Sequence, residues 1–233
     1  VYFLSNNSSR WKPTYADRLA SMGIDADPDD IVLSTDGVID YLRTNGIESS
    51  YVVGTEAMRE AIAAAGIEPT ASDPETVVVG FDTELTYEKV AAATLAIREG
   101  AEFLVAHGDR VCPTEAGLVP DCGSIAALVE TATGREPSHV FGKPSVGMID
   151  HVLEREGYAP SDVAIVGDRL STDIELAERL GCESVSVLSG ETTRRAVETA
   201  DQTPSLVVES VGDLLAESPD PAETASPVDS TEL

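Results

Sequence analysis

Short apolar runs alternate with longer segments of helical periodicity along most of the chain. The apolar runs predict strands at residues 1–4, 31–33, 51–53, 76–80, 102–105, 139–141, 163–166, 184–188 and 206–208. Helical spacing of apolar positions, often closed by a glycine, predicts helices at residues 15–22, 35–44, 56–65, 87–99, 124–133, 148–156 and 173–180. Because alternating strands and helices build a parallel sheet covered by helices, the pattern predicts an α/β, doubly wound fold.

Two segments depart from this alternation. Residues 106–123 contain three Gly and two Pro and show neither period, so they are predicted to form one long loop, which in a compact domain is usually functional or mobile. Residues 217–233 carry five acidic residues, no basic ones and three Pro. This composition predicts a disordered acidic tail.

Polar residues follow three of the predicted strands. They are Ser5-Asn6-Asn7, Gly142-Lys143-Pro144-Ser145, and Gly167-Asp168 with Asp173 close behind. In an open parallel sheet, the loops at the carboxyl ends of the strands form the ligand crevice. The pattern therefore predicts that a hydroxyl, amides, an ammonium and two carboxylates converge in one place.

This set of groups suits a metal-bound phosphate. Lys143 would meet phosphate as a point charge, and Ser5 and Asn6 would donate hydrogen bonds to its oxygens. Asp168 and Asp173 offer oxygen ligands, which Mg²⁺ prefers. Each element also has a plainer interpretation, since Ser and Asn form turns and an acid at a helix start complements the helix dipole.

The three segments resemble motifs of a known family. VYFLSNNSSR at 1–10, GKPS at 142–145 and VGDRLSTD at 166–173 resemble motifs II, III and IV of haloacid dehalogenase (HAD) superfamily phosphatases, in the NagD-like and 4-nitrophenylphosphatase-like group. The resemblance covers nearly everything except the acidic tail. It implies a HAD core with a smaller inserted α/β cap, and Mg²⁺-dependent hydrolysis of a phosphomonoester through an aspartyl-phosphate.

The resemblance also implies roles for residues of the core. Ser5, Asn6 and Asn7 would bind the substrate phosphate, and Lys143 would steady the phosphoryl group and the nucleophile. Asp168 would be a Mg²⁺ ligand, and Asp173 a supporting catalytic acid. The substrate would be a small phosphorylated metabolite, such as a sugar phosphate, a nucleoside monophosphate or phosphoglycolate.

The cap loop would select the substrate, with His107 and Asp109 as its candidate contacts. Family members often show Thr-Asn-x-Asp in this loop, where this chain has Ala106-His107-Gly108-Asp109. The implied domains are a first core part at 1–48, a cap at 49–138, a second core part at 139–216 and the tail at 217–233. An oligomer formed through the cap is left open.

The nucleophile expected from the family has no counterpart in this sequence. The family places Asp-x-Asp at the end of a first strand, upstream of motif II, whereas Asp36-Gly37 follows motif II and belongs to the next helix start. The chain as written is therefore expected to show little or no turnover. The alternative is a non-catalytic phosphate-binding or regulatory homologue, or a fragment.

Charge and cysteine content indicate the class of partner and the cellular environment of the protein. The net charge of −27, from 42 Asp plus Glu against 15 Lys plus Arg, opposes binding to nucleic acid polymers and is typical of a salt-accumulating halophile. The three cysteines form no Cys-x-x-Cys pair and are expected to be reduced thiols. The sequence shows no apolar run long enough to span a membrane and no signal peptide, so a cytoplasmic protein is expected.

Overall fold

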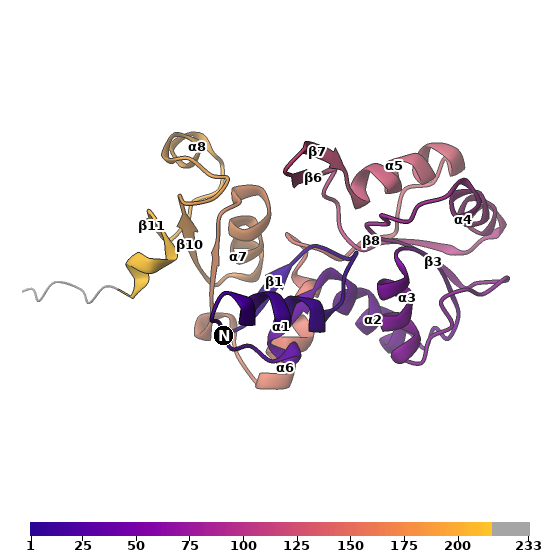
Figure 1. Ribbon diagram of the computed structural model, residues 1–233, viewed down its shortest axis with the longest axis horizontal. Helices are drawn as coiled ribbons and strands as arrows, with labels where there is room; N and C mark the ends of the chain where they lie inside the picture. The colour runs from indigo at the N-terminus through magenta and orange to yellow at the C-terminus, as the bar shows by residue number, and fades with distance from the viewer. Residues whose placement is uncertain (216–233) are drawn as a thin grey trace, which may run out of the picture. The chain divides into compact units, whose positions relative to one another are not determined.

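The computed structural model describes residues 1–215, which belong to two compact units, Val1–Ala159 and a unit that begins at Pro160 (Figure 1). The acidic tail predicted at 217–233 lies outside the described residues. Within the described part of the chain, no helix is both long and apolar enough to cross a membrane.

The first unit carries two parallel sheets and a hairpin. Its strands are β1 (Phe3–Ser5), β2 (Ile31–Leu33), β3 (Ser50–Val53), β4 (Thr76–Val79), β5 (Glu102–Val105), β6 (Val111–Thr114), β7 (Gly117–Pro120) and β8 (His139–Val140). β1 pairs with β2, and a four-stranded sheet has the order β3-β4-β5-β8. β6 and β7 form an antiparallel hairpin, in which Val111 pairs with Pro120.

Six helices accompany these strands. They are α1 (Lys12–Ser21), α2 (Ser34–Thr44), α3 (Glu56–Ala64), α4 (Tyr87–Glu99), α5 (Cys122–Thr133) and α6 (Asp150–Glu156). In Figure 1, α4 and α5 lie together on one side of the four-stranded sheet and α3 lies on the other. The central strands β4 and β5 are nearly all apolar because both of their faces are buried.

Helix starts in this unit follow from local sequence. The hydroxyls of Thr55 and Thr86 accept the backbone N–H groups of Met58 and Lys89, which caps α3 and α4. Gly100 ends α4 with a φ of 125°, a conformation that favours glycine. The caps at Thr55 and Thr86 thereby help to order the loops that follow β3 and β4.

The second unit is a three-stranded parallel sheet with two helices. Its strands are β9 (Ala164–Gly167), β10 (Glu183–Val187) and β11 (Leu206–Val208), in the order β11-β10-β9. Its helices are α7 (Glu175–Leu180) and α8 (Arg194–Thr199). A π-helical turn, Leu170–Ile174, connects the end of β9 to α7, and such turns are frequent at functional sites.

The predicted alternation of strands and helices and the predicted parallel pairing are confirmed, with four corrections. The loop expected over residues 106–123 contains the β6–β7 hairpin, and α5 begins at Cys122 rather than at residue 124. Helix α1 begins at Lys12, three residues before the predicted start, because Pro13 suits the first turn of a helix. Helix α8 was not predicted.

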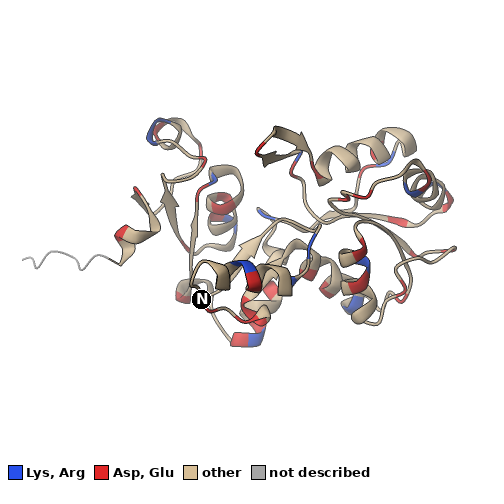
Figure 2. Ribbon diagram, in the orientation of Figure 1, with Lys and Arg blue, Asp and Glu red and all other residues tan. Residues whose placement is uncertain are grey.

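Strand β8 pairs with β5, so it extends the sheet formed by β3, β4 and β5. The prediction placed residue 139 at the start of the second core part, after the cap. The domain boundaries at 48, 138 and 216 stay a prediction. Acidic residues occur along helices and loops of both units, with fewer Lys and Arg between them (Figure 2).

Candidate phosphate-binding and metal-binding residues

The loop after β1 is shaped by its own side chains. The Ser5 hydroxyl accepts the backbone N–H of Asn7 at 3.2 Å, and Asn7 Oδ1 accepts the backbone N–H and the hydroxyl of Ser9, both at 2.8 Å. Such side-chain to backbone bonds form tight turns. Burial raises the pKa of Tyr15, which lies near Ser5, and a hydrogen bond with Ser5 opposes this shift.

The side-chain amide of Asn6 joins this loop to two others. Asn6 Oδ1 accepts the backbone N–H of Lys143 at 2.7 Å, and Nδ2 donates to the Lys143 carbonyl at 3.2 Å. Nδ2 also donates to Asp109 Oδ2 at 3.2 Å. We call the paired bonds between Asn6 and Lys143 the Asn6–Lys143 clasp. Through its side-chain amide, Asn6 thus connects to both Lys143 and Asp109, and these three predicted site residues come from segments more than 30 residues apart along the chain.

The clasp depends on a close approach at Gly142. A Cβ on Gly142 would lie 2.9 Å from Asn6 Oδ1 and would overlap the Cβ of His107. The ammonium of Lys143 donates to the Leu4 carbonyl at 3.4 Å, so it lies at the carboxyl end of β1. The sequence GKPS is thus packed against the residues that follow β1, as the convergence of the motifs predicts.

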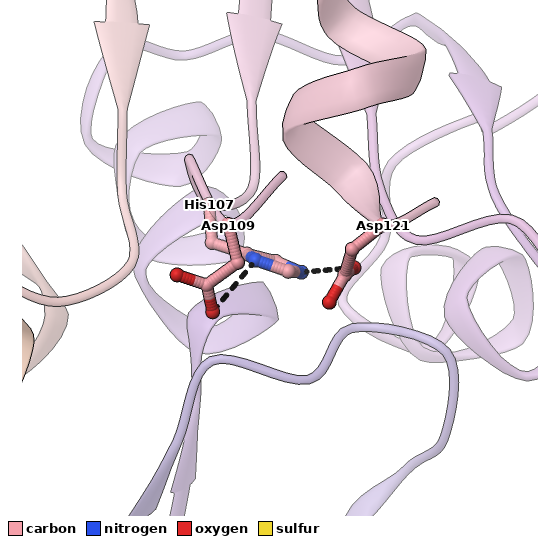
Figure 3. Close-up of side chains that lie close together, drawn as sticks. All are labelled: His107, Asp109 and Asp121. Atoms are coloured by element: carbon pink, nitrogen blue, oxygen red, sulfur yellow. Dashed lines mark ion pairs between the residues drawn. The ribbon is translucent and has the colours of Figure 1, made fainter. Parts of the chain in front are cut away.

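His107 lies between two carboxylates (Figure 3). Its Nδ1 is 3.5 Å from Asp109 Oδ2, and its Nε2 is 3.6 Å from Asp121 Oδ1. The imidazole is 1% exposed, and neither ring nitrogen has a hydrogen-bond partner. Asp121 is the N-cap residue of α5, and burial raises the pKa of the neighbouring Cys122 thiol.

The second unit holds the two predicted carboxylates at the end of β9. Asp168 Oδ2 accepts the backbone N–H of Glu191 at 2.9 Å, and Gly190 lies so close to this carboxylate that a Cβ there would overlap it. Asp173 is 6% exposed, and its Oδ2 accepts the backbone N–H of Arg169 at 3.1 Å. The π-helical turn therefore holds Asp173 beside Asp168, within this unit.

Comparisons with known proteins agree with the motif order. A family profile described as haloacid dehalogenase-like hydrolase matches residues 1–68, and one described as HAD-hydrolase-like matches residues 140–214. An acid sugar phosphatase from Staphylococcus haemolyticus is 34% identical over 207 residues, which are 87% of this chain and 78% of that protein. The chain belongs to the haloacid dehalogenase-like hydrolases.

Solved structures place it among the NagD-like phosphatases of this family. A 4-nitrophenylphosphatase from Thermotoga maritima matches with a TM-score of 0.88 and 36% identity, covering 91% of this chain and 82% of that one. A glycerol phosphate phosphatase from Mycobacterium tuberculosis, solved in complex with magnesium, matches with a TM-score of 0.83 and 34% identity, covering 89% and 64%. The resemblance and the fold class predicted from the sequence are confirmed, and the chain is a HAD phosphatase with a core and a cap domain.

Two residues near this site were not predicted from the sequence, Asp121 and Ser8. Asp121 was placed inside a loop, because no pattern marks it as the cap of a helix that starts one residue later. Ser8 is fully buried, and its hydroxyl accepts the backbone N–H of Phe81 at 2.8 Å, which ties the loop after β1 to the end of β4. A serine in a turn gives no signal of this in the sequence.

Asp36 lies at the start of α2, as the sequence predicts. Its carboxylate accepts the backbone N–H of Leu33 at 2.8 Å and forms an ion pair with Lys12 at 2.9 Å. Asp36 lies in the first turn of α2, where an acid also complements the helix dipole, and Lys12 is the first residue of α1. Asp36 therefore acts as a helix cap.

Proposed function

We propose that this chain contributes the phosphate- and metal-binding residues of a Mg²⁺-dependent phosphomonoesterase. Its substrate would be a small phosphorylated metabolite of the sugar phosphate, nucleoside monophosphate or phosphoglycolate class. The names of the relatives support this range, since they include an acid sugar phosphatase and a glycerol phosphate phosphatase. The observation that carries the proposal is the position of Lys143 against the end of β1.

Lys143 and Ser5 would bind the phosphoryl group. Lys143 Nζ lies 3.4 Å from the carbonyl of Leu4, the residue before Ser5, so an ammonium and a hydroxyl share one strand end. An ammonium there would balance the charge that develops on the phosphoryl oxygens during transfer. Because the side chain of Asn6 is engaged between loops, we propose that Asn6 binds phosphate through its backbone N–H group. The backbone N–H of Asn7 already donates to the Ser5 hydroxyl, so Asn7 would order the loop that surrounds the phosphate.

Asp168 would hold Mg²⁺, with Asp173 as its supporting acid. The residues fit this ion, because two carboxylates lie at one strand end and a glycine, Gly190, leaves room against Asp168 that a Cβ would fill. Mg²⁺ usually binds one or two protein carboxylates together with substrate phosphate. When bound, the ion supplies positive charge to the transferring phosphoryl group.

We further propose that the nucleophile lies on an Asp-x-Asp strand beside β1 or β9. Among the described residues, β1 pairs only with β2, and β9 pairs only with β10, so each strand has an edge that could accept another. A hollow of about 200 Å³, lined mainly by apolar side chains, lies beside β1 and α1. The first carboxylate of that strand would attack phosphorus as the ester oxygen leaves, and the second would protonate the leaving oxygen.

The test compares the 233-residue chain with a form extended by the residues encoded immediately upstream. Hydrolysis of 4-nitrophenyl phosphate, glycerol phosphate and sugar phosphates is measured with Mg²⁺ and with EDTA. We expect Mg²⁺-dependent turnover only in the form that carries Asp-x-Asp. Robust turnover by the 233-residue chain would show that the nucleophile lies among its own residues.

Two substitutions test the assigned residues in the active form. Lys143→Ala and Asp168→Asn are each expected to lower kcat/KM at least 100-fold, in line with the loss of one group that stabilises transition-state charge, about 10²–10³. Arg98→Ala and Asp201→Asn remove the same charges from exposed positions and serve as matched controls. Normal activity of either site variant would overturn its assignment. Phosphate binding with Mg²⁺ but no turnover would instead favour a binding protein.

A further inference from the structure

His107 departs from the family's usual loop sequence, and its surroundings are specific. Each ring nitrogen of this buried imidazole faces a carboxylate oxygen, Asp109 Oδ2 on one side and Asp121 Oδ1 on the other (Figure 3). The two carboxylates come from different elements, the loop after β5 and the start of α5. The imidazole therefore connects the two ends of the segment that includes the β6–β7 hairpin.

The protonation state of the ring decides how many of these contacts are favourable. An ionised carboxylate only accepts hydrogen bonds, and a neutral imidazole donates through one nitrogen only. A neutral ring would therefore turn a lone pair toward one of the two carboxylates. A doubly protonated ring can donate to both, and each charge-assisted bond is stronger than a neutral one.

A chain of contacts leads from His107 to Lys143. Asp109 Oδ2, which faces His107 Nδ1 at 3.5 Å, also accepts a hydrogen bond from Asn6 Nδ2 at 3.2 Å. The same amide, through Oδ1, accepts the backbone N–H of Lys143 at 2.7 Å. The Cβ of His107 also lies against Gly142, where no second Cβ would fit. The imidazole thus touches the clasp through both a carboxylate and direct packing.

We propose that His107 is a positioning residue of the phosphatase, whose buried side chain packs against Asp109 and Gly142 and thereby keeps the Asn6–Lys143 clasp in place. The proposal rests on the function assigned to Lys143. Removal of the imidazole would leave Asp109 without the ring that lies 3.5 Å from its Oδ2. Asn6 would then be oriented less tightly, and the Lys143 loop would lose order at the phosphate site.

The titratable groups around the imidazole come from three elements. Asp109 lies on its own loop, Asp121 and the buried Cys122 thiol lie at the start of α5, and Lys143 follows Gly142 after β8. Two carboxylates thus face the ring directly, whereas the ammonium of Lys143 donates toward β1.

A single metal ion fits the cluster less well. The ligand atoms of His107, Asp109 and Asp121 lie within 4.8 Å of one another. However, the two ring nitrogens face opposite carboxylates, so one ion could bind one nitrogen and would leave the other nitrogen to the second carboxylate. Titration with Zn²⁺ or Mn²⁺ is therefore part of the test.

The test follows the side-chain amide signals of Asn6 by NMR in the full chain, without phosphate or added metal. We expect His107→Asn to shift and broaden these signals, whereas the control His139→Asn leaves them as they are in the parent. Because these NMR signals require no turnover, their result does not depend on the assigned phosphatase chemistry.

Activity provides the second measurement, in the active form of the enzyme. His107→Asn is expected to lower kcat/KM about 2- to 13-fold, the factor that one hydrogen bond of about 0.5–1.5 kcal/mol corresponds to. Asn6 side-chain amide signals that are the same in His107→Asn as in the parent would overturn the proposal. So would a stoichiometric shift of the His107 signals by Zn²⁺ or Mn²⁺, since it would make the cluster a metal site.

Discussion

Gly142→Ala is the sharpest test of the packing at the candidate site. The added Cβ would lie 2.9 Å from Asn6 Oδ1 and 3.0 Å from Asn6 Cγ, and would overlap the Cβ of His107. All three atoms are held in place, because His107 is fully buried and Asn6 is tied to two other loops. The methyl group therefore cannot be accommodated without moving the clasp.

The expected loss of stability follows from these contacts. Overpacking a well-packed site costs about 1–3 kcal/mol, and weakening the bond between Asn6 and Lys143 adds about 0.5–1.5 kcal/mol. For a domain of this size, each kcal/mol lowers Tm by about 2–4 °C. A total of about 1.5–4.5 kcal/mol therefore corresponds to a fall in Tm of about 3–18 °C.

Gly147→Ala is the matched control from the same segment. The nearest atom to its added Cβ would be Ser145 Oγ at 3.7 Å, an ordinary contact. Thermal and urea unfolding, followed by circular dichroism in molar KCl, would compare both variants with the parent. We expect Gly147→Ala to leave Tm unchanged or slightly raised. Equal Tm values for Gly142→Ala and the parent, or an equal fall in both variants, would refute the packing argument.

Three further predictions concern the dependence of stability on salt, its dependence on pH, and the reactivity of a buried thiol. Tm should rise as KCl approaches molar concentration, because the Debye length falls to about 3 Å there and repulsion within a chain of net charge −27 is screened. A Tm that is independent of salt, or that falls with it, would contradict the halophile interpretation. Burial lowers the pKa of His151 below its ordinary 6.5, so the unfolded chain binds this proton more readily and stability should fall as pH drops through that range. His151→Gln should flatten this fall in the free energy of unfolding measured between pH 5 and 7, and an unaltered slope would count against it. Burial also raises the pKa of the Cys122 thiol, so Cys122 should react with a thiol reagent only after unfolding, as peptide mapping of the labelled chain would show.

The sequence predicted the elements well where burial dictates the residue type. Val77, Val78 and Val79 have to be apolar on both faces of a central strand, so β4 could be predicted from its composition alone. The hairpin β6–β7 escaped because most of its residues are exposed and it contains Pro113 and Pro120, which usually argue against a strand. Its pairing is fixed by the neighbouring elements.

The candidate site was predictable as a set of segments and less so as a set of contacts. The convergence of Asn6 and Lys143 followed from the order of the motifs. The use of the Asn6 amide as a connection between loops did not, because a sequence shows which groups are present and not which of them are already hydrogen-bonded. Asp121 was missed for a related reason, since its role depends on a helix start that the predicted loop concealed.

The hairpin between β6 and β7 has an evolutionary consequence. Its first and last residues, Val111 and Pro120, are paired partners, so the chain leaves and re-enters the fold at one point. Insertions or replacements at its turn would leave the spacing between Asp109 and Asp121 unchanged, and exposed turns are where chains tolerate such changes. Related proteins could therefore diversify this projection freely while the buried imidazole and its two carboxylates stayed in register.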